Sequence, residues 1–215
     1  MKKLLTLLVI AMPSIAAAQP GGMYSQPEPP MAFHNGLTFE ANLGFGAMWS
    51  RVERSSSGGT SVDESESYAS LGANLGIGGF IAPNLAITAR MTSVNYTQDA
   101  NDGLGGTDTL SAIFFGPSVQ YWINPNLWIG GGIGYAIAHR SYQNDFGETG
   151  DSTNDPTGIA LDLRVGYTFW KQARNSLNVS FEYTPGFYGE DDYGALGRVS
   201  YQLNGMAVLF GYQYL

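Results

Sequence analysis

The sequence predicts an all-β fold: a single eight-stranded antiparallel β-barrel that crosses a membrane as an up-and-down meander. Three observations favour this fold class. Large apolar residues alternate with small or polar ones in eight segments after residue 36. Only 13% of the 215 residues are charged, whereas 29 are glycine. The connections between the segments are alternately short and long, so the two ends of the predicted barrel differ.

The first segment, Met1–Ala18, has the pattern of a secretory signal peptide. Two lysines open it, a short apolar stretch follows, and three consecutive alanines supply the small residues of a cleavage site. The apolar stretch is shorter than the ~20 residues that a membrane-spanning helix requires. We therefore expect export with cleavage of this signal peptide. A periplasmic linker rich in proline and glycine should follow at residues 19–36, and the barrel at residues 37–215.

The segment 158–169 shows the alternation most clearly. Its odd positions are Ile, Leu, Leu, Val, Tyr and Phe, and its even positions are Gly, Ala, Asp, Arg, Gly and Thr. This period of two is typical of β-strands. The same period recurs in seven other segments, at 37–50, 68–78, 85–92, 113–121, 129–137, 177–187 and 206–214.

The two faces of these segments indicate a membrane protein. The second face is mostly Gly, Ala, Ser, Thr and Asn, which are poor residues for an exterior in water but suit a crowded barrel interior. The large apolar face then contacts lipid. A closed barrel also pairs every backbone polar group, which a lipid environment demands.

The connections place the acidic residues at one end of the barrel. Short connections fall at 81–84, 124–126 and 171–175, and long polar ones fall at 51–66, 98–108, 140–156 and 188–195. Short turns on one side and long loops on the other are typical of outer-membrane barrels. Most of the 18 acidic residues lie in the long connections, so the acidity belongs to the outer rim.

The composition excludes several classes of function. The absence of cysteine excludes disulfide scaffolds, thiol enzymes and cysteine-ligated metal sites. The net charge of −8, with no basic patch, argues against nucleic-acid binding. Two histidines, one of them in the linker, make a zinc or haem site implausible. We expect no metal and no cofactor.

The pair Asn204-Gly205 leaves the strand count open. It is a strong two-residue hairpin signal, which would create a ninth strand at 196–203. Bacterial single-chain barrels have even strand counts. The apolar residues also change from odd to even positions here, and a β-bulge at Asn204-Gly205 within one long strand explains both facts. We therefore expect eight strands.

Two stretches resemble small OmpA/OmpX-like outer-membrane β-barrel domains. One is the hairpin formed by Gly116–Trp122 and Trp128–Tyr135; the other is the ending Phe210–Leu215, which is similar to the C-terminal signal of such barrels. Leu215 departs from the terminal Phe or Trp of the family. The resemblance implies location in the outer membrane of a Gram-negative cell. It also implies contact with membrane lipid and lipopolysaccharide, recognition of the last strand by the β-barrel assembly machinery, and a monomer.

Five charged residues occupy inward positions of the predicted strands, and they are the candidate site. A bare charge inside a narrow barrel is costly, so these side chains should form a network of ion pairs. The strand register places Arg164 beside Glu182. We expect a permanent polar plug, and the alternative is a gate that opens to pass ions. The five residues are Glu40, Arg90, Asp162, Arg164 and Glu182.

One further pattern is His139-Arg140-Ser141, at the outer end of a strand. The histidine and the serine share the lipid-facing side, which resembles the H-x-S pair of outer-membrane lipid A deacylases. The histidine would act as base and the serine as nucleophile. The carboxylate that should orient the histidine is missing from the barrel exterior, and Glu148 is the nearest candidate.

The sequence therefore favours a protein that is not an enzyme, with a role in structural support, surface interaction or minor diffusion. Two alternatives remain. One is a transporter or narrow pore for small or apolar molecules, through the interior or a lateral opening. The other is a lipid A esterase that uses His139 and Ser141.

Overall fold

The computed structural model describes residues 35–56, 59–64, 67–99, 106–143, 149–151, 155–192 and 198–215. The expected signal peptide lies outside the described residues, as does the expected linker except for its last two residues. No helix in these ranges is long and apolar enough to cross a membrane.

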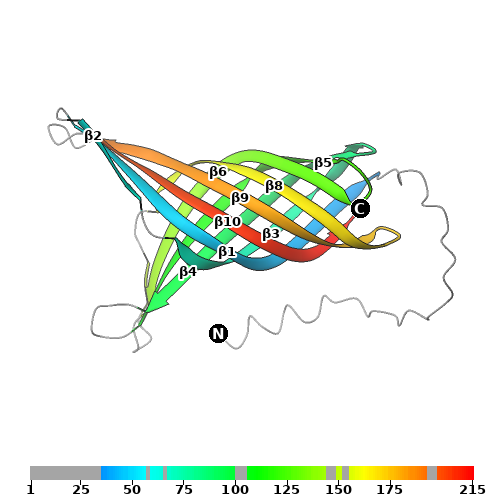
Figure 1. The fold of residues 1–215 in the computed structure, drawn as a ribbon, viewed down its shortest axis with the longest axis horizontal. Coiled ribbons are helices and arrows are strands. Elements are labelled where there is room, and N and C mark those ends of the chain that lie inside the picture. The colour runs from blue at the N-terminus through cyan, green and yellow to red at the C-terminus, as the bar shows by residue number, and fades with distance from the viewer. Residues whose placement is uncertain are drawn as a thin grey trace. The chain divides into compact units, whose positions relative to one another are not determined.

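The described residues form ten strands, of which eight are long (Figure 1). The long strands are β1 (Leu37–Ser56), β3 (Tyr68–Ala82), β4 (Leu85–Asp99), β5 (Thr107–Trp122), β6 (Leu127–Gln143), β8 (Thr157–Gln172), β9 (Asn175–Asp192) and β10 (Arg198–Tyr214). The short strand β2 (Gly59–Glu64) pairs with β1, and β7 (Thr149–Asp151) pairs with β6. Each of the eight predicted segments lies within one long strand, so the period of two located every long strand correctly.

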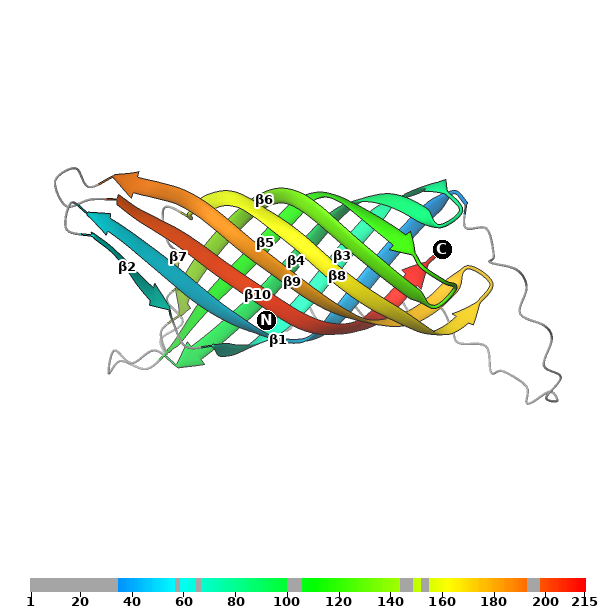
Figure 2. The same ribbon diagram turned by 45° about the horizontal axis from the view of Figure 1, so that its top comes forward.

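The long strands form an antiparallel meander whose hydrogen bonding returns on itself. Each long strand pairs with the next long strand in the chain, and β10 pairs with β1 from Phe39↔Tyr214 to Ser55↔Arg198. Figures 1 and 2 show the resulting ring of tilted strands. No strand of this ring therefore presents a long unpaired edge among the described residues.

The tilt of the strands follows from the pairing register. Successive Cα partners, followed from Ala47 on β1 through the other seven long strands, lead back to Leu37 on β1. This row of paired residues therefore comes back to β1 at a position offset by 47 − 37 = 10 residues from the one where it began. A ring with such an offset closes only when its strands are inclined to its axis.

The two faces of the ring differ as the alternation predicts. In β8, the even positions from Ala160 to Thr168 are buried and the odd positions from Ile159 to Phe169 are exposed. Leu163, in the middle of this strand, is 50% exposed. In this strand, large apolar side chains thus cover the outside of the ring, and small or polar ones point inside.

The ends of the ring differ in their connections. The connections β3–β4, β5–β6 and β8–β9 are short, and the C-terminus lies at the same end (Figure 2). We call this the turn end and the opposite one the loop end. In the β8–β9 turn, Ala173 adopts a left-handed backbone with φ of 54°.

The structure corrects the interpretation of Asn204-Gly205. Strand β10 runs through both residues, so they form no hairpin turn. The expected bulge is not there either: the register shifts between Ser200 and Tyr201, which pair with Glu190 and Tyr188 of β9. The change of apolar parity has another cause. The interior itself becomes apolar toward the loop end, so Leu203 is buried inside while Met206, three residues on, faces outward.

The interior has three layers. At the turn end, four buried residues form an inner apolar cluster: Ala86, Trp122, Trp128 and Leu215. At the loop end, eight buried residues form an outer apolar cluster: Met48, Val94, Phe114, Ala136, Ala138, Ala160, Tyr188 and Leu203. Polar and charged side chains fill the layer between the two clusters.

Candidate functional site

The five charged residues of the candidate site meet inside the ring, between the two apolar clusters. Glu40 comes from β1, Arg90 from β4, Asp162 and Arg164 from β8, and Glu182 from β9. None of them is more than 5% exposed. Each occupies an inward position of its strand, so β1, β4 and the hairpin of β8 and β9, which are distant in sequence, bring the charges together.

Arg90 lies at the centre of this ion-pair cluster. Its guanidinium contacts the carboxylates of Glu40 and Glu182, and its Nε atom lies 3.3 Å from Oδ2 of Asp162. The second cation, Arg164, places Nη1 3.1 Å from Oε1 of Glu40 and Nε 3.5 Å from Oδ2 of Asp162. Two guanidinium groups are thus shared among three carboxylates. Such sharing offsets the large desolvation cost of buried charges.

The expected neighbours Arg164 and Glu182 are adjacent in the backbone but do not form the expected pair. Their Cα atoms are cross-strand partners. However, the side chain of Arg164 reaches across the interior to Glu40, and Glu182 contacts Arg90 instead. The strand register determines which Cα atoms are adjacent. The direction of the long side chains depends instead on the positions of all the buried charges in the interior.

Polar neighbours that the sequence analysis did not single out complete the cluster. The Nδ2 group of Asn74 donates to Oε1 of Glu182 at 2.6 Å, and the hydroxyl of Thr92 donates to Oε2 at 3.4 Å. Arg164 donates from Nη2 to the hydroxyl of Ser118 at 2.9 Å. All three neighbours occupy inward positions, so the same alternation that located the charges could have located them.

Aromatic and glycine residues fit around Arg164. Its Cζ atom lies 5.5 Å from the centre of the Trp128 ring, a cation–π distance. A Cβ atom at Gly130 would lie 2.6 Å from Nε of Arg164, and one at Gly76 would lie 3.0 Å from Cγ of Glu40. Glycine is needed at these two positions because the charged side chains occupy the space of a Cβ atom. The cluster is therefore closely packed against the backbone at both glycines.

The pair His139 and Ser141 lies near the loop end of β6. The Nδ1 atom of His139 lies 2.9 Å from Oδ2 of Asp155, and the two side chains are 34% and 31% exposed. Ser111 of β5 is the cross-strand partner of His139, and Ser141 is two residues further along β6. The expected carboxylate, Glu148, lies outside the described residues; Asp155 holds that position in the structure.

A further ion pair lies at the loop end, between an exposed arginine and a mostly buried aspartate. Arg140 donates hydrogen bonds from Nε and Nη2 to the carboxylate of Asp108, at 3.0 and 2.5 Å. These hydrogen bonds hold the pKa of Asp108 below its ordinary value, against a smaller opposing effect of burial. Among the described residues, no group of three or more His, Asp or Glu side chains could hold a metal ion.

No protein-family model and no curated protein sequence matches this chain. Several solved structures are similar to this chain at low sequence identity. The Neisserial surface protein A, NspA, is 16% identical, with a TM-score of 0.47, and the match covers 82% of this chain and 96% of that one. The outer membrane protein OprG from Pseudomonas aeruginosa is 14% identical, with a TM-score of 0.44 and coverage of 86% and 99%. Ail, the attachment invasion locus protein of Yersinia pestis, is 16% identical, with a TM-score of 0.41 and coverage of 81% and 98%. NspA, OprG and Ail, to which this chain is similar, are small outer-membrane β-barrel proteins.

Proposed function

We propose that this chain is an eight-stranded β-barrel of the Gram-negative outer membrane, closed to ions by its ion-pair cluster, with a structural or surface-interaction role and no enzymatic activity. One observation carries the proposal: the ring is apolar outside and charged inside. Exposed apolar residues such as Phe45 and Leu163 would be unfavourable in water over so large an area. The same residues are stabilising when they face lipid.

The height of the apolar face supports a membrane location. On β1, the outward positions from Leu37 to Ala47 are apolar. Ten residues of a strand tilted by roughly 40° rise about 25 Å. This equals the ~25 Å height of the apolar band in outer-membrane barrels.

The interior supports a closed barrel over an open pore. An eight-stranded barrel is only wide enough for its own side chains to fill it. Here the filling consists of the ion-pair cluster, with an apolar cluster on either side of it. Ions could pass only if charged pairs separated, so we expect minor diffusion at most.

The turn end would face the periplasm and the loop end the cell exterior. Under this orientation the outer face contacts lipopolysaccharide, and β10 is the strand that the assembly machinery recognises. The outward aromatic residues of β10 are Phe210, Tyr212 and Tyr214, whereas Leu215 is 3% exposed and packs in the inner apolar cluster. We propose that Tyr214 takes the role of the terminal aromatic residue, that the protein is a monomer, and that Met1–Ala18 is a cleaved signal peptide.

Planar-bilayer recording tests the closed interior. We expect the wild-type protein to conduct poorly, with rare and brief openings. The variant Arg90→Ala with Glu182→Ala removes one cation and one anion from the centre of the cluster, so it should conduct more than wild type. The variant Arg54→Ala with Asp63→Ala removes an exposed pair and is the matched control. A large and steady wild-type conductance would show an open pore and refute the proposal.

A second candidate function is an esterase that acts on an acyl ester of the outer leaflet. The observation that favours it is the contact of Asp155 with Nδ1 of His139, because a carboxylate in this position orients a histidine base. The hydroxyl of Ser141 or of Ser111 would be the nucleophile. Mass spectrometry of lipid A from cells that express wild type, Ser141→Ala or Ser111→Ala tests it: loss of an acyl chain with wild type, abolished by either substitution, would establish the activity.

A further inference from the structure

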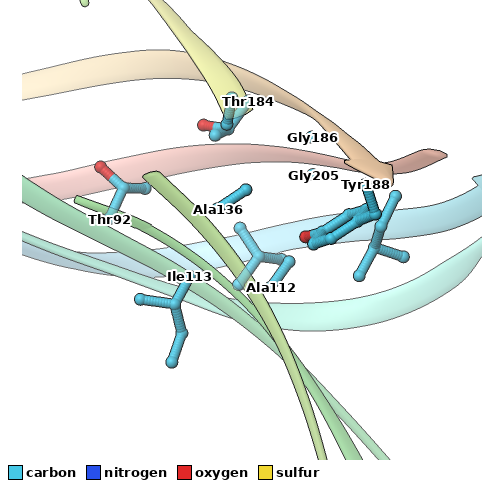
Figure 3. A pocket seen from close by; sticks show the side chains of 11 residues that line it. Thr92, Ala112, Ile113, Ala136, Thr184, Gly186, Tyr188 and Gly205 are labelled. Atoms are coloured by element: carbon cyan, nitrogen blue, oxygen red, sulfur yellow. The ribbon is translucent and has the colours of Figure 1, made fainter. Parts of the chain in front are cut away.

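The interior of the ring offers little room for a ligand, so the outer surface is where a partner can bind. A cavity inside the loop end, shown in Figure 3, has a volume of about 10 Å³, which is room for about one water molecule. Thr92 lines this cavity and donates its hydroxyl to Glu182 of the ion-pair cluster, so the cavity ends at buried charges.

The charged side chains of the turn end are positive. Among the described residues they are Lys171 and Arg174, both in the hairpin of β8 and β9. The described Asp and Glu side chains lie in the ion-pair cluster or at the loop end. The carboxylate of the last residue, Leu215, lies at the turn end, but in the described part of the chain it forms no ion pair with either cation.

Arg174 is held in place where β9, β10 and the start of β1 meet. Its Nη2 group donates to Oδ1 of Asn35 at 3.0 Å, and its Nη1 group donates to the hydroxyl of Tyr214 at 3.5 Å. The Cζ atom lies 5.9 Å from the centre of the Tyr214 ring, a cation–π distance. The guanidinium is therefore positioned from two sides, although the side chain of Arg174 is exposed.

The hydrogen-bonding groups that remain free around Arg174 are mainly donors. A guanidinium has five N–H groups, and two hydrogen bonds are formed here. The hydroxyl of Tyr214 accepts from Arg174 and keeps its own hydrogen to donate, and Asn35 keeps its Nδ2 group. Such a set of donors suits a phosphate group, whose oxygens accept hydrogen bonds and which arginine binds with two parallel N–H groups.

The height of Arg174 on the ring matches that of a lipid headgroup. Its partner Asn35 lies two residues before Leu37, the first apolar residue on the outer face of β1. Two residues of a strand tilted by roughly 40° rise about 5 Å. The headgroup region of a bilayer extends about 5–7 Å beyond the hydrocarbon core on each side.

Outward aromatic side chains extend the apolar face up to this level. Strand β8 has a bulge at Phe169, so Phe169 and Trp170 both face outward and are 55% and 43% exposed. Tyr212 and Tyr214 are the outward aromatic residues at the same end of β10. Tryptophan and tyrosine favour the boundary between hydrocarbon and headgroups, so these residues and Arg174 form one continuous surface for lipid.

We propose that Arg174, Tyr214 and Asn35 bind the phosphate of an anionic phospholipid, of the phosphatidylglycerol type, in the leaflet at the turn end. An anionic lipid is favoured over a zwitterionic one because no described acidic side chain at this end could pair with an ammonium group. The site deepens the proposed outer-membrane barrel, and it rests on that proposal for the contact of the turn end with lipid.

Quenching of tryptophan fluorescence by brominated lipids tests the site. In phosphatidylcholine vesicles, a Trp49→Phe background leaves Trp170 as the exposed tryptophan, because Trp122 and Trp128 are buried. We expect brominated phosphatidylglycerol to bind beside Trp170 about fivefold more strongly than brominated phosphatidylcholine. Both leaflets of the vesicle contain the same lipids, so the result does not depend on the orientation of the protein.

Three variants locate the site. Arg174→Gln should abolish the preference for phosphatidylglycerol. Tyr214→Phe keeps the ring that assembly is proposed to need but loses the hydroxyl, and it should lower the preference roughly twofold. Lys171→Gln is the matched control in the same hairpin. The Nζ group of Lys171 donates to the carbonyl of Pro125 at 2.5 Å and the side chain is half-buried, so most of the preference should remain.

Four outcomes would count against the proposals, and they are distinguishable. Equal losses in Arg174→Gln and Lys171→Gln would mean that the lipid responds only to the net charge of the turn end. Equal quenching of the wild-type Trp170 by both lipids would overturn the site but leave the barrel standing. Displacement of brominated phosphatidylglycerol by inorganic phosphate, at an ionic strength where chloride has no effect, would assign the site to free phosphate and overturn the lipid. Absence of quenching by either lipid would instead contradict the lipid contact of the proposed function.

Discussion

Arg90 of β4 and Glu182 of β9 form an ion pair inside the ring, although 92 residues separate them in the chain. The two strands are not neighbours in the sheet, so this contact crosses the interior. It is therefore a property of the ring and not of any hairpin. The stability of the whole structure should depend on it.

Replacement of Arg90 by alanine should destabilise the protein strongly. Arg90→Ala leaves three buried carboxylates with one guanidinium, and breaking a buried pair from one side typically costs about 3–5 kcal/mol. The double variant Arg90→Ala with Glu182→Ala should recover part of this loss because it removes one of the uncompensated charges. Urea unfolding in lipid vesicles, followed by tryptophan fluorescence, measures both. If the free energy of unfolding falls in the double variant by the sum of the losses in Arg90→Ala and Glu182→Ala, the two side chains contribute no coupling energy.

The lipid face should be sensitive to charge. Leu163→Arg places a cation near the middle of the apolar face and should destabilise the protein by about 2–4 kcal/mol. The control is Thr168→Ala on the inner face, because the Thr168 hydroxyl has no hydrogen-bond partner among the described residues. The same unfolding experiment compares them, and losses of similar size would mean that the two faces are assigned the wrong way round.

The contact between Trp128 and Gly166 should tolerate no added methyl group. A Cβ atom at Gly166 would overlap the ring of Trp128, which is fully buried and packs on Arg164. Gly166→Ala should therefore destabilise the protein by about 1–3 kcal/mol through overpacking. Gly150→Ala is the control, since nothing lies within 4 Å of a Cβ atom there. A stable Gly166→Ala protein with an unchanged tryptophan spectrum would contradict the packing described here.

The pKa of Asp108 should lie below the ordinary range of an aspartate, because this residue is paired with Arg140. Hydrogen bonds from Arg140 lower the pKa of Asp108, so the pair stabilises the folded protein at pH values above about 4 and loses its effect as pH falls through the lowered pKa. Carboxyl-carbon NMR of Asp108 measures the shift directly. In Arg140→Ala the pKa of Asp108 should rise toward its ordinary value, because the hydrogen bonds that lower it most are lost. An Asp108 pKa that does not change on Arg140→Ala would refute the pairing.

Much of the fold could be predicted because the barrel imposes one rule on every strand. In a strand that separates two environments, successive side chains face opposite sides. The apolar Leu163 and the charged Arg164 therefore identify the outer and the inner face from the sequence of this strand alone. The same rule placed all five charges inside the ring. It failed at Leu203, where the interior itself changes from polar to apolar, and this change was mistaken for a bulge at Asn204-Gly205.

The sequence by itself determined the period, the faces and the strand order, because these depend on neighbours within one strand or one hairpin. Only the tertiary structure decided which charges pair. Arg164 and Glu182 are adjacent by register, yet each finds its partner across the interior, on Glu40 and Arg90. Long side chains minimise electrostatic energy over the whole enclosed volume, and that volume exists only once β10 has paired with β1. The outer apolar cluster depends on the same closure, because its side chains come from seven strands that must meet before they can pack together.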